Sequence, residues 1–280
     1  MMNKILLCSD LDRTILPNGP QPESPRALEI FMHLAAREEL TLAYVSGRSE
    51  VLLKKAISDH SLPIPDYAIG DVGTTIYEPM NDWQPWQDWA EEIGRDWHGK
   101  SREELAGLID NLEELTPQED EKQNTFKLSY YAPSSLDPIP LKNTIAGRLE
   151  QAEVRASIIW SIDELKDVGL VDILPRRATK VHAIRFLMEK KAFAHERTVF
   201  AGDSGNDMEA LTSGLHAVLV KNARDEVREE AMRIMEEQGM RERLYLARGD
   251  FLEMNGNYCA GVLEGLAHFL PQTKEWMESG

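Results

Sequence analysis

The 280-residue sequence predicts an α/β protein: a doubly wound, Rossmann-like parallel sheet that carries an inserted α+β domain. Three observations lead to this prediction. Apolar runs of strand length alternate with amphipathic helical stretches up to residue 69, the same alternation returns after Pro175, and the segments in between do not alternate strictly. Alternating strands and helices are typical of a parallel sheet covered by helices. We therefore expect a core made of residues 1–79 and 175–280, and an insert at 80–174.

The first part of the core begins with a strand at Lys4–Ser9. Its continuous apolar run suits a strand that is buried on both faces. A helix with apolar residues at a period near 3.6 follows Pro25, and Ser24 is placed to act as its N-cap. The alternation continues with a strand, a helix and a strand at Leu40–Val45, Ser49–Asp59 and Tyr67–Ile69.

The expected insert opens on an acidic stretch that holds four of the six tryptophans, Trp83, Trp86, Trp89 and Trp97. We expect this stretch to be helical, and helical spacing favours packing inside the insert over stacking on a carbohydrate ring. The rest of the insert is predicted as a mixed set of strands near Thr125–Tyr131, Val154–Trp160 and Gly169–Leu174, with a helix near Leu141–Gln151.

The second part of the core restores the alternation of helix and strand. Its apolar periodicity predicts six further elements. They are a helix at Val181–Lys191, a strand at Thr198–Ala201, a helix at Asp207–Ser213, a strand at Ala217–Val220, and helices at Arg224–Gln238 and Gly261–Phe269.

The charge balance excludes several classes of partner. Lys and Arg number 31 and Asp and Glu 48, so the formal net charge is −17. Such a surface repels nucleic acid and anionic lipid, and it would repel an anionic substrate unless a metal ion and basic groups reverse the local potential. No apolar run approaches the ~18–20 residues that span a bilayer, and nothing resembles a signal peptide. We expect a cytoplasmic protein that binds neither nucleic acid nor membrane.

Polar groups gather where four expected elements of the core begin or end. They are Asp10 and Asp12 after the first strand, Ser46 and Gly47 after the second, Lys180 at the start of a helix, and the loop Gly202–Asp207 after a later strand. Each has a purely structural explanation, since aspartates and Ser-Gly pairs form turns and a lone lysine is usually a solvated charge. Parallel strands, however, end at one edge of a sheet, so the four sites can converge there.

Phosphoryl transfer is the chemistry that needs this combination of groups. A divalent cation and a lysine neutralise the phosphate oxygens, one carboxylate attacks phosphorus, and a second carboxylate moves the proton. The carboxylates of the loop Gly202–Asp207 offer the hard oxygen ligands that Mg²⁺ prefers. The loop lacks the twelve-residue pattern of an EF-hand, so a calcium site of that type is excluded.

Taken in order, DLDRT, VSGRS, the lone Lys180 and GDSGND resemble the four motifs of the haloacid dehalogenase-like phosphohydrolases. The large insert between the second and third motifs resembles the subgroup that carries an α+β cap. Further strings are similar to those of the sucrose-phosphate phosphatases, over nearly the whole chain: LAYVSGRS, PDYAIGDVGTTIY, NTFKLSYY, VDILP, GDSGND and VKNA. The resemblance implies that the insert acts as the cap that selects the sugar.

The resemblance also implies a Mg²⁺-dependent phosphatase that acts on sucrose-6-phosphate or a related disaccharide phosphate through an aspartyl-phosphate. Asp10 would be the nucleophile and Asp12 the acid and base. The implied metal ligands are Asp10, Asp12 through its carbonyl oxygen, and Asp203, with Asp207 close to the metal or bound to it through water. The phosphoryl oxygens would be held by Ser46, Gly47, Lys180 and Asn206. The oligomeric state and an association with a sugar-phosphate synthase stay open.

For the sugar, strand alternation places Lys127, Ser129 and Tyr131 on one face. The resemblance suggests that this face looks into the catalytic cleft, and Arg48 is a further candidate for the sugar. A solvated strand face is the alternative. Aromatic and directional polar groups together suit a sugar ring.

Three features depart from the family pattern. Arg13 replaces the usual small residue, and we favour a surface ion pair for it over contact with the substrate. Asp71 adds a carboxylate that could orient a sugar hydroxyl or a basic group, or start a turn. The connection at 161–169 is longer than is typical.

Two other functions remain open at this stage. A phosphosugar mutase of the same fold would return the phosphoryl group to the sugar and would depend on a bisphosphate primer. A non-catalytic phosphosugar-binding regulator belongs to a different class of protein, and the complete set Asp10, Asp12, Lys180 and Asp203 argues against it.

Overall fold

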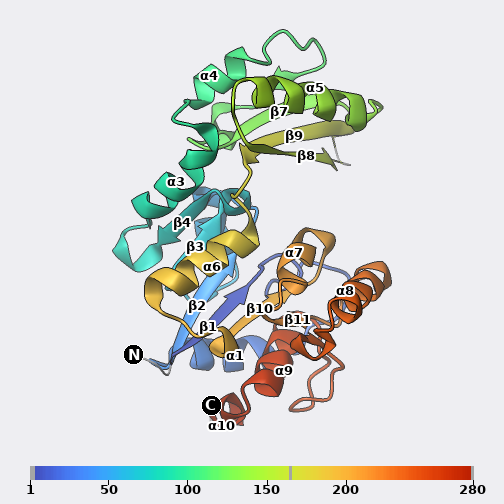
Figure 1. Cartoon of the computed structure of the whole chain (residues 1–280). Helices are drawn as coiled ribbons and strands as arrows, with labels where there is room; N and C mark the ends of the chain where they lie inside the picture. Colours follow the sequence, from blue (N-terminus) through green and yellow to red (C-terminus); the bar gives the residue numbers. More distant parts are fainter. Residues whose placement is uncertain (1–3, 164–165, 279–280) are drawn as a thin grey trace. The chain divides into compact units, whose positions relative to one another are not determined.

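The computed structural model describes residues 4–163 and 166–278 and divides into two compact units. Unit 1 comprises Met1–Pro85 with Lys180–Gly280, and unit 2 comprises Trp86–Thr179 (Figure 1). The second unit therefore runs from residue 86 to 179, where the sequence predicts an insert at 80–174. The shift at the first boundary arises because Gln84–Pro85 forms a short strand that pairs with the sheet of unit 1.

Unit 1 is built on an eight-stranded sheet with the order β12-β11-β10-β1-β2-β3-β4-β5. The strands from β12 to β3 run parallel, while β4 and β5 extend the sheet antiparallel. The strands are β1 Ile5–Ser9, β2 Leu40–Val45, β3 Tyr67–Gly70, β4 Thr75–Glu78, β5 Gln84–Pro85, β10 Thr198–Gly202, β11 His216–Leu219 and β12 Leu244–Leu246. The central strand β1 is fully buried, as its apolar run predicts.

Helices cover both faces of this sheet. One face and its helices share a single apolar cluster, which contains Ile5 and Leu7 of β1. The helices in that cluster are α1 Ala27–Ala35, α2 Glu50–Asp59, α9 Cys259–Phe269 and α10 Gln272–Glu278. Leu6 and Cys8, which alternate with them, are buried on the opposite side, where α6 Lys180–Lys191 and α7 Met208–Leu211 pack together and α7 lies on β10 and β11. This architecture confirms the predicted Rossmann-like core.

Unit 2 has its own sheet and its own apolar core. Its four strands have the order β6-β7-β9-β8 and pair antiparallel. They are β6 Thr116–Pro117, β7 Leu128–Pro133, β8 Ala156–Asp163 and β9 Val168–Pro175, accompanied by the helices α3 Gln87–Gly94, α4 Arg102–Gly107 and α5 Pro138–Gln151. The core contains Trp97, Leu105 and Ile145. The buried Asp96 carboxylate also pairs with Arg155 and Arg177, so unit 2 satisfies its buried charge internally.

Two local expectations are wrong. Ser24 does not cap α1, whose N-cap is Arg26; the Ser24 hydroxyl instead accepts a hydrogen bond from the backbone N–H of Asn255 at 2.9 Å. Trp83 is not part of a helix of unit 2 and packs against the apolar cluster of unit 1. The other three tryptophans stay in unit 2, where Trp89 and Trp97 are buried. Both errors concern contacts between segments that are distant along the chain.

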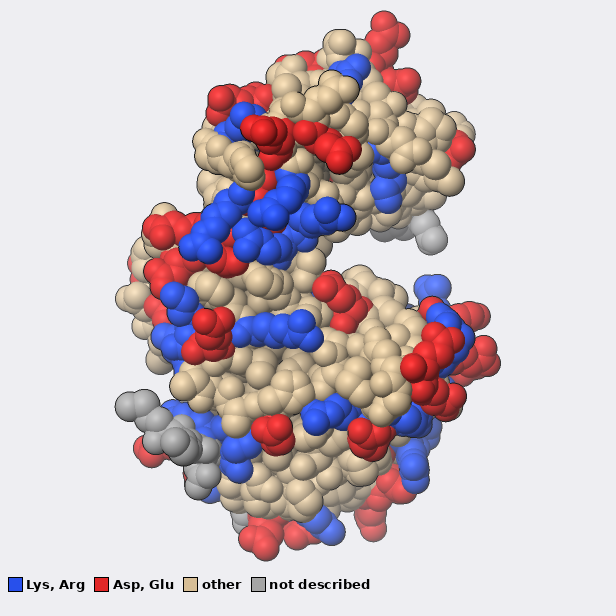
Figure 2. All heavy atoms as spheres, in the orientation of Figure 1, with Lys and Arg blue, Asp and Glu red and all other residues tan. Residues whose placement is uncertain are grey.

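The long connection at 161–169 belongs largely to the β8–β9 hairpin. Strand β8 continues to Asp163 and β9 begins at Val168, where the two residues pair. Positions 164 and 165 lie outside the described residues. Lys and Arg side chains are interspersed with Asp and Glu over the face in Figure 2. Within residues 4–163 and 166–278, no helix is both long and apolar enough to cross a membrane.

Candidate active site

The candidate site lies where three neighbouring strands of unit 1 end. Strands β10, β1 and β2 are adjacent and parallel, so the residues after them meet at one edge of the sheet. Asp10 follows β1, Ser46 follows β2 and Asp203 follows β10. The backbone pairing continues into the site, because Asp10 N donates to Ala201 O at 2.9 Å and Ser46 N to Ile69 O at 2.8 Å. These residues therefore occupy rigid positions.

Lys180 joins two of the carboxylates. It is the first residue of α6, and its Nζ lies 2.9 Å from Asp10 Oδ1 and 2.7 Å from Asp207 Oδ1. All three side chains are buried. Burial raises the pKa of Asp10 to about 7, although the charge of Lys180 opposes the rise. Burial alone would lower the pKa of Lys180, but Asp207 and Asp10 raise it above its ordinary value, so the ammonium stays charged.

The acidic loop after β10 holds Asp207 in place. Asp207 Oδ2 accepts hydrogen bonds from the backbone N–H groups of Asp203 and Ser204, each at 3.2 Å. Gly202 is required for this closeness, since a Cβ there would lie 2.7 Å from Asp207 Cγ. The loop Gly202–Asp207, with two glycines and four polar residues, is thus a compact turn that returns the Asp207 carboxylate towards β1.

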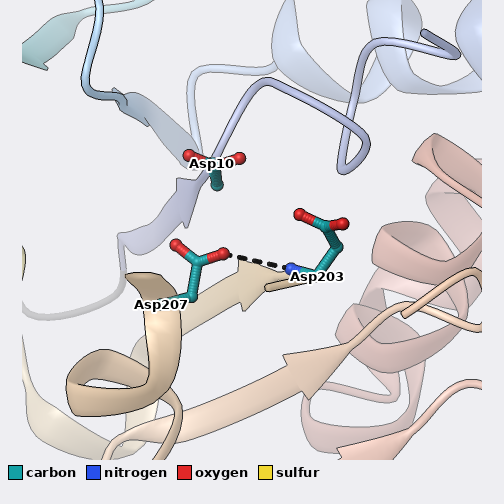
Figure 3. A group of neighbouring side chains, drawn as sticks. All are labelled: Asp10, Asp203 and Asp207. Atoms are coloured by element: carbon teal, nitrogen blue, oxygen red, sulfur yellow. Dashed lines mark hydrogen bonds between the residues drawn. The ribbon is translucent and has the colours of Figure 1, made fainter. Parts of the chain in front are cut away.

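Three buried carboxylates form a group that could hold a metal ion. One oxygen from each of Asp10, Asp203 and Asp207 lies within 4.8 Å of the others (Figure 3). The group contains more negative charge than Lys180 and Arg13 supply, and burial raises the pKa of Asp203 as well. An oxygen-only set of this kind fits a hard divalent cation. The side chain of Asp12 lies outside this group.

Asp12 has a different environment. Arg48 donates to it through Nε at 2.8 Å and Nη2 at 2.6 Å, and Asn18 Nδ2 donates at 2.7 Å. Burial pushes the pKa of Asp12 up, but the hydrogen bonds from Arg48 and Asn18 and the Arg48 charge bring it below the ordinary value. Asp10 and Asp12 therefore have pKa values moved in opposite directions, a pattern found where two carboxylates have different chemical roles.

A cavity of about 580 Å³ opens over these groups. Its lining includes Ser46, Gly47 and Asn206, the residues that the family resemblance suggests for binding a phosphoryl group. A side chain on Gly47 would meet no atom within 4 Å, so the space above it is free for a ligand. Lys180 is not among the lining residues, and it contacts Asp10 and Asp207 instead.

Two arginines that sequence analysis did not place in the site also line this cavity. Arg13 donates through Nε to Asp203 Oδ2 at 3.0 Å, so it pairs with a candidate metal ligand. It is an ion-pair partner, as favoured from the sequence, but at the cavity wall and only partly exposed. Arg224 lines the cavity from the start of α8 (Asp225–Glu237), directly after the VKNA string. With Arg48 they supply the positive charge that an anionic substrate needs in an acidic protein.

The three residues predicted to contact the sugar have partners within unit 2. Ser129 is buried, and its hydroxyl donates to Asp172 Oδ1 at 2.5 Å. Lys127 Nζ lies 3.8 Å from the same carboxylate oxygen. The Tyr131 hydroxyl binds Glu119 at 2.8 Å and accepts from Lys122 at 2.8 Å. Ser129 is thus closed to direct contact with a ligand, because its neighbours enclose it completely.

Asp71 lies in unit 1 and is largely buried. Its Oδ2 accepts a hydrogen bond from the Tyr77 hydroxyl at 2.8 Å, and its carbonyl oxygen accepts one from the Thr74 hydroxyl at 3.0 Å. Burial raises the pKa of Tyr77, and the Asp71 charge raises it further. Among the alternatives left open for Asp71, the structure supports its place in a turn.

The fold and the carboxylate site define a class of protein, the haloacid dehalogenase-like phosphohydrolases. The solved structure of the sucrose-phosphatase from Synechocystis sp. PCC6803, in complex with sucrose and phosphate, superposes with a TM-score of 0.71 at 28% identity, covering 96% of this chain and 98% of that one. The profile of the family described as sucrose-6F-phosphate phosphohydrolase matches residues 3–270. The chain belongs to this family of phosphoric monoester hydrolases.

Two relatives extend this result. A protein of Nitrosococcus oceani named as a HAD-like hydrolase is 57% identical over 281 residues, covering 100% of this chain and 76% of the relative. The mannosylfructose-phosphate phosphatase of Agrobacterium fabrum is 27% identical, covering 94% of this chain and 96% of its own. The chain spans about half the length of the plant sucrose-phosphatases that it matches, 52% in the case of tobacco sucrose-phosphatase 1.

Proposed function

We propose that this chain hydrolyses the phosphate ester of a disaccharide, sucrose-6-phosphate or a close relative, in a Mg²⁺-dependent reaction. The observation that carries the proposal is the meeting of Asp10, Lys180, Asp203 and Asp207 at the end of the central strand. Relatives that act on two different disaccharide phosphates support this substrate class without choosing between its members.

In this proposal Asp10 is the nucleophile. One of its oxygens bonds to phosphorus as the bond from phosphorus to the sugar oxygen breaks, and Asp12 gives the departing oxygen its proton. Water then attacks the aspartyl-phosphate, Asp12 takes a proton back from that water, and inorganic phosphate leaves as the bond to Asp10 breaks. Because Arg48 holds Asp12 ionised, the acid step requires Asp12 to bind a proton and loosen from Arg48 when the ester is present.

Asp10, Asp203 and Asp207, with the Asp12 carbonyl oxygen, would hold Mg²⁺, which neutralises charge on the phosphoryl oxygens when it is bound. Lys180 keeps Asp10 and Asp207 oriented by contacting both. Ser46, the Gly47 backbone and Asn206 would bind the remaining phosphoryl oxygens. Arg13 and Arg224 add positive charge at the cavity wall.

The decisive test is phosphate release from a panel of phosphorylated mono- and disaccharides, with Mg²⁺ and with excess chelator. The proposal expects the highest kcat/KM on a disaccharide phosphate and loss of turnover in chelator. Turnover that survives exhaustive chelation would contradict the metal dependence, and a preference for monosaccharide phosphates would contradict the substrate class. A product that is a phosphate isomer, formed only with a bisphosphate primer, would show a mutase instead.

We also propose that unit 2 supplies the discrimination between sugars, with Lys127, whose side chain is 14% exposed, as its candidate and Arg48 as a second candidate in unit 1. Ser129 acts only indirectly, since it shares Asp172 with Lys127. Lys127→Ala should lower kcat/KM for the preferred sugar phosphate by roughly 10- to 100-fold, the effect of one charged hydrogen bond. Hydrolysis of p-nitrophenyl phosphate should change little. Lys142→Ala, on α5 of the same unit, is the matched control; equal losses on both substrates would show that Lys127 serves folding.

A further inference from the structure

Unit 1 contains a second cavity, of about 690 Å³, whose lining residues belong to the edge strand β12, its flanking segments, the helices α8 and α9, and the loop after β11. Four cationic side chains line it: Lys221, Arg228, Arg241 and Arg248. Among the described residues that line the cavity, Glu242 is the one carboxylate. None of them lines the catalytic cavity. This concentration of positive charge stands in a chain whose net charge is −17.

The cationic groups of this cavity are poorly neutralised. Within residues 4–163 and 166–278, Lys221 Nζ and the Arg248 guanidinium make no ion pair. Arg241 donates to a backbone carbonyl, that of Leu244, at 2.6 Å. Arg228 reaches Asp225 only at 4.0 Å, and its Nε is buried without a hydrogen bond. Like charges held near one another without partners raise the free energy of the fold, and an anion would lower it.

The walls of the cavity are held in place by hydrogen bonds. The buried Glu264 carboxylate of α9 accepts from the backbone N–H groups of Arg248 at 2.6 Å and Gly249 at 2.9 Å, and from the Tyr245 hydroxyl at 2.8 Å. Both of its oxygens accept hydrogen bonds from backbone or hydroxyl groups, and among the described residues Glu264 makes no ion pair with the cationic side chains of the cavity. Lys221 N donates to Gly256 O at 3.0 Å, which fixes the opposite side. The site is preformed, so binding a ligand would cost little ordering entropy.

We propose that this cavity binds a small anion that bears a phosphate group, at a site separate from the catalytic one. Its volume falls within the range of small-ligand pockets, which favours a small molecule over a protein or nucleic-acid partner. Arginine and lysine side chains are the usual ligands of phosphate oxygens. Tyr245 and His268 also line the cavity, with their rings stacked on each other at 4.3 Å, so that its wall is aromatic as well as cationic. The pKa of His268 is lowered, first by burial and then by Arg248, which agrees with an uncompensated positive field.

The two cavities share one loop of the chain. Lys221 faces the second cavity, and its neighbour Asn222 donates to the carbonyl oxygen of Arg13 at 2.7 Å. Arg13 in turn binds Asp203 at the catalytic edge. The second cavity is therefore connected to the catalytic groups through this loop, but the two cavities share no lining residue. Substitutions in one cavity can thus test binding there without removing a residue of the other.

The test is calorimetric titration of the full chain in EDTA, with inorganic pyrophosphate in one arm and glucose 6-phosphate in the other. EDTA removes the divalent cations that would recruit an anion to the catalytic carboxylates, and the variants below separate any binding that remains there from binding in the second cavity. The double variant Lys221→Gln/Arg248→Gln should bind at least about tenfold more weakly, since two charge-assisted contacts are lost. The charge-matched control Arg233→Gln/Lys274→Gln, at exposed positions outside the cavity, should bind as the unmodified chain does.

The two arms separate the sources of the phosphate. Binding of pyrophosphate alone would assign an inorganic anion, binding of glucose 6-phosphate alone would assign a phosphate ester, and binding of both would assign a site that recognises the phosphate group itself. No binding to the unmodified chain at millimolar concentrations, or equal affinities for the chain and the double variant, would overturn the proposal. If the double variant fails to fold, Glu242→Gln decides: removing the cavity's carboxylate should tighten binding several-fold, and an unchanged or weaker affinity would contradict the site.

Discussion

At the scale of single residues, the candidate site separates two carboxylates that lie only two positions apart. Asp10 faces Lys180 in a buried position, whereas Asp12 faces Arg48 at the cavity. The first is suited to attack phosphorus, because it is oriented by an ammonium at 2.9 Å. The second can exchange protons, because it is partly exposed and held by groups that can release it. Substitutions of the two residues should therefore lower turnover to different extents.

Asp10→Asn should abolish turnover, because an amide cannot form the acyl-phosphate. Asp12→Asn should slow turnover by about 10²–10⁴-fold, the usual contribution of a general acid and base. Steady-state release of phosphate from the best sugar phosphate measures both effects, and Asp59→Asn, exposed on α2, is the control. Trapped phospho-enzyme in the Asp12 variant would support the two-step route, whereas near-normal activity of Asp10→Asn would refute it.

Arg13 should compete with a divalent cation for Asp203. Its guanidinium lies 3.0 Å from Asp203 Oδ2 and is 31% exposed, so solvent screens the pair. Arg13→Gln should therefore lower the Mg²⁺ concentration at the midpoint of thermal stabilisation, by about two- to fivefold, the size expected of a partly screened ion pair. Melting temperatures measured across a Mg²⁺ series would test this without any assay of activity. A midpoint that rises would show that Arg13 helps to hold the cation.

At the scale of elements, α9 packs on β11, the strand that leads into the loop with Lys221 and Asn222. This loop contributes Lys221 to the second cavity and binds Arg13 of the catalytic cavity through Asn222. Gly265 allows the contact between α9 and β11, since a Cβ there would overlap the side chain of Val218 in β11. The neighbouring Glu264 ties the same helix to the segment after β12. Small side chains on this helix face are thus a requirement of close packing.

Gly265→Ala should lower the free energy of unfolding by about 1–3 kcal/mol, because the added methyl group overpacks the contact between helix and strand. Gly147→Ala is the matched control inside α5, where a Cβ meets no atom within 4 Å. That substitution should instead raise stability by about 0.5–1 kcal/mol through helix propensity. Urea unfolding of the two variants measures both changes. Equal effects would show that α9 is not packed on β11 as described.

At the scale of the whole molecule, stability depends on pH through histidines that the fold keeps neutral. The pKa of His216 at the start of β11 is lowered, first by burial and then by Arg243. Its ring stacks on Phe269 at 4.4 Å, and its Nδ1 is buried without a hydrogen bond. The unfolded chain therefore binds a proton on this residue more readily than the folded chain, so His216 costs stability as the pH falls below its unfolded pKa.

His216→Phe should remove this dependence while keeping the stacked contact with Phe269. The free energy of unfolding of the unmodified chain should fall relative to that of the variant as the pH is lowered from about 7.5 to 5.5. The difference between the two proteins isolates His216, because every other titrating group is common to both. Denaturant unfolding at several pH values measures it, and a difference that is constant with pH would contradict the prediction.

Much of the core could be predicted because its signals are local. The apolar runs of β1, β2 and β10 and the polar residues directly after them are read from neighbouring positions. The failures share a physical cause. Ser24 is a residue type that often caps helices, but its hydroxyl accepts a hydrogen bond from the backbone of Asn255 instead. Trp83 follows the helical spacing of the neighbouring tryptophans, but it packs against the apolar cluster of unit 1. In each, a tertiary contact outweighs a local preference of about 1 kcal/mol or less.

The sequence by itself determined the alternation of β1, β2, β3, β10 and β11 with helices, and it predicted that Asp10, Ser46, Lys180 and Asp203 lie where these elements end or begin. It did not predict β4, β5 or β12, which complete the sheet of unit 1. Only the tertiary structure decided which charges neutralise one another. Arg13 forms an ion pair with Asp203 and Arg48 forms one with Asp12, whereas Lys221 and Arg248 form none within the described chain. The reason is that ion pairing depends on distance and burial in space, and these vary steeply between residues that are remote along the chain.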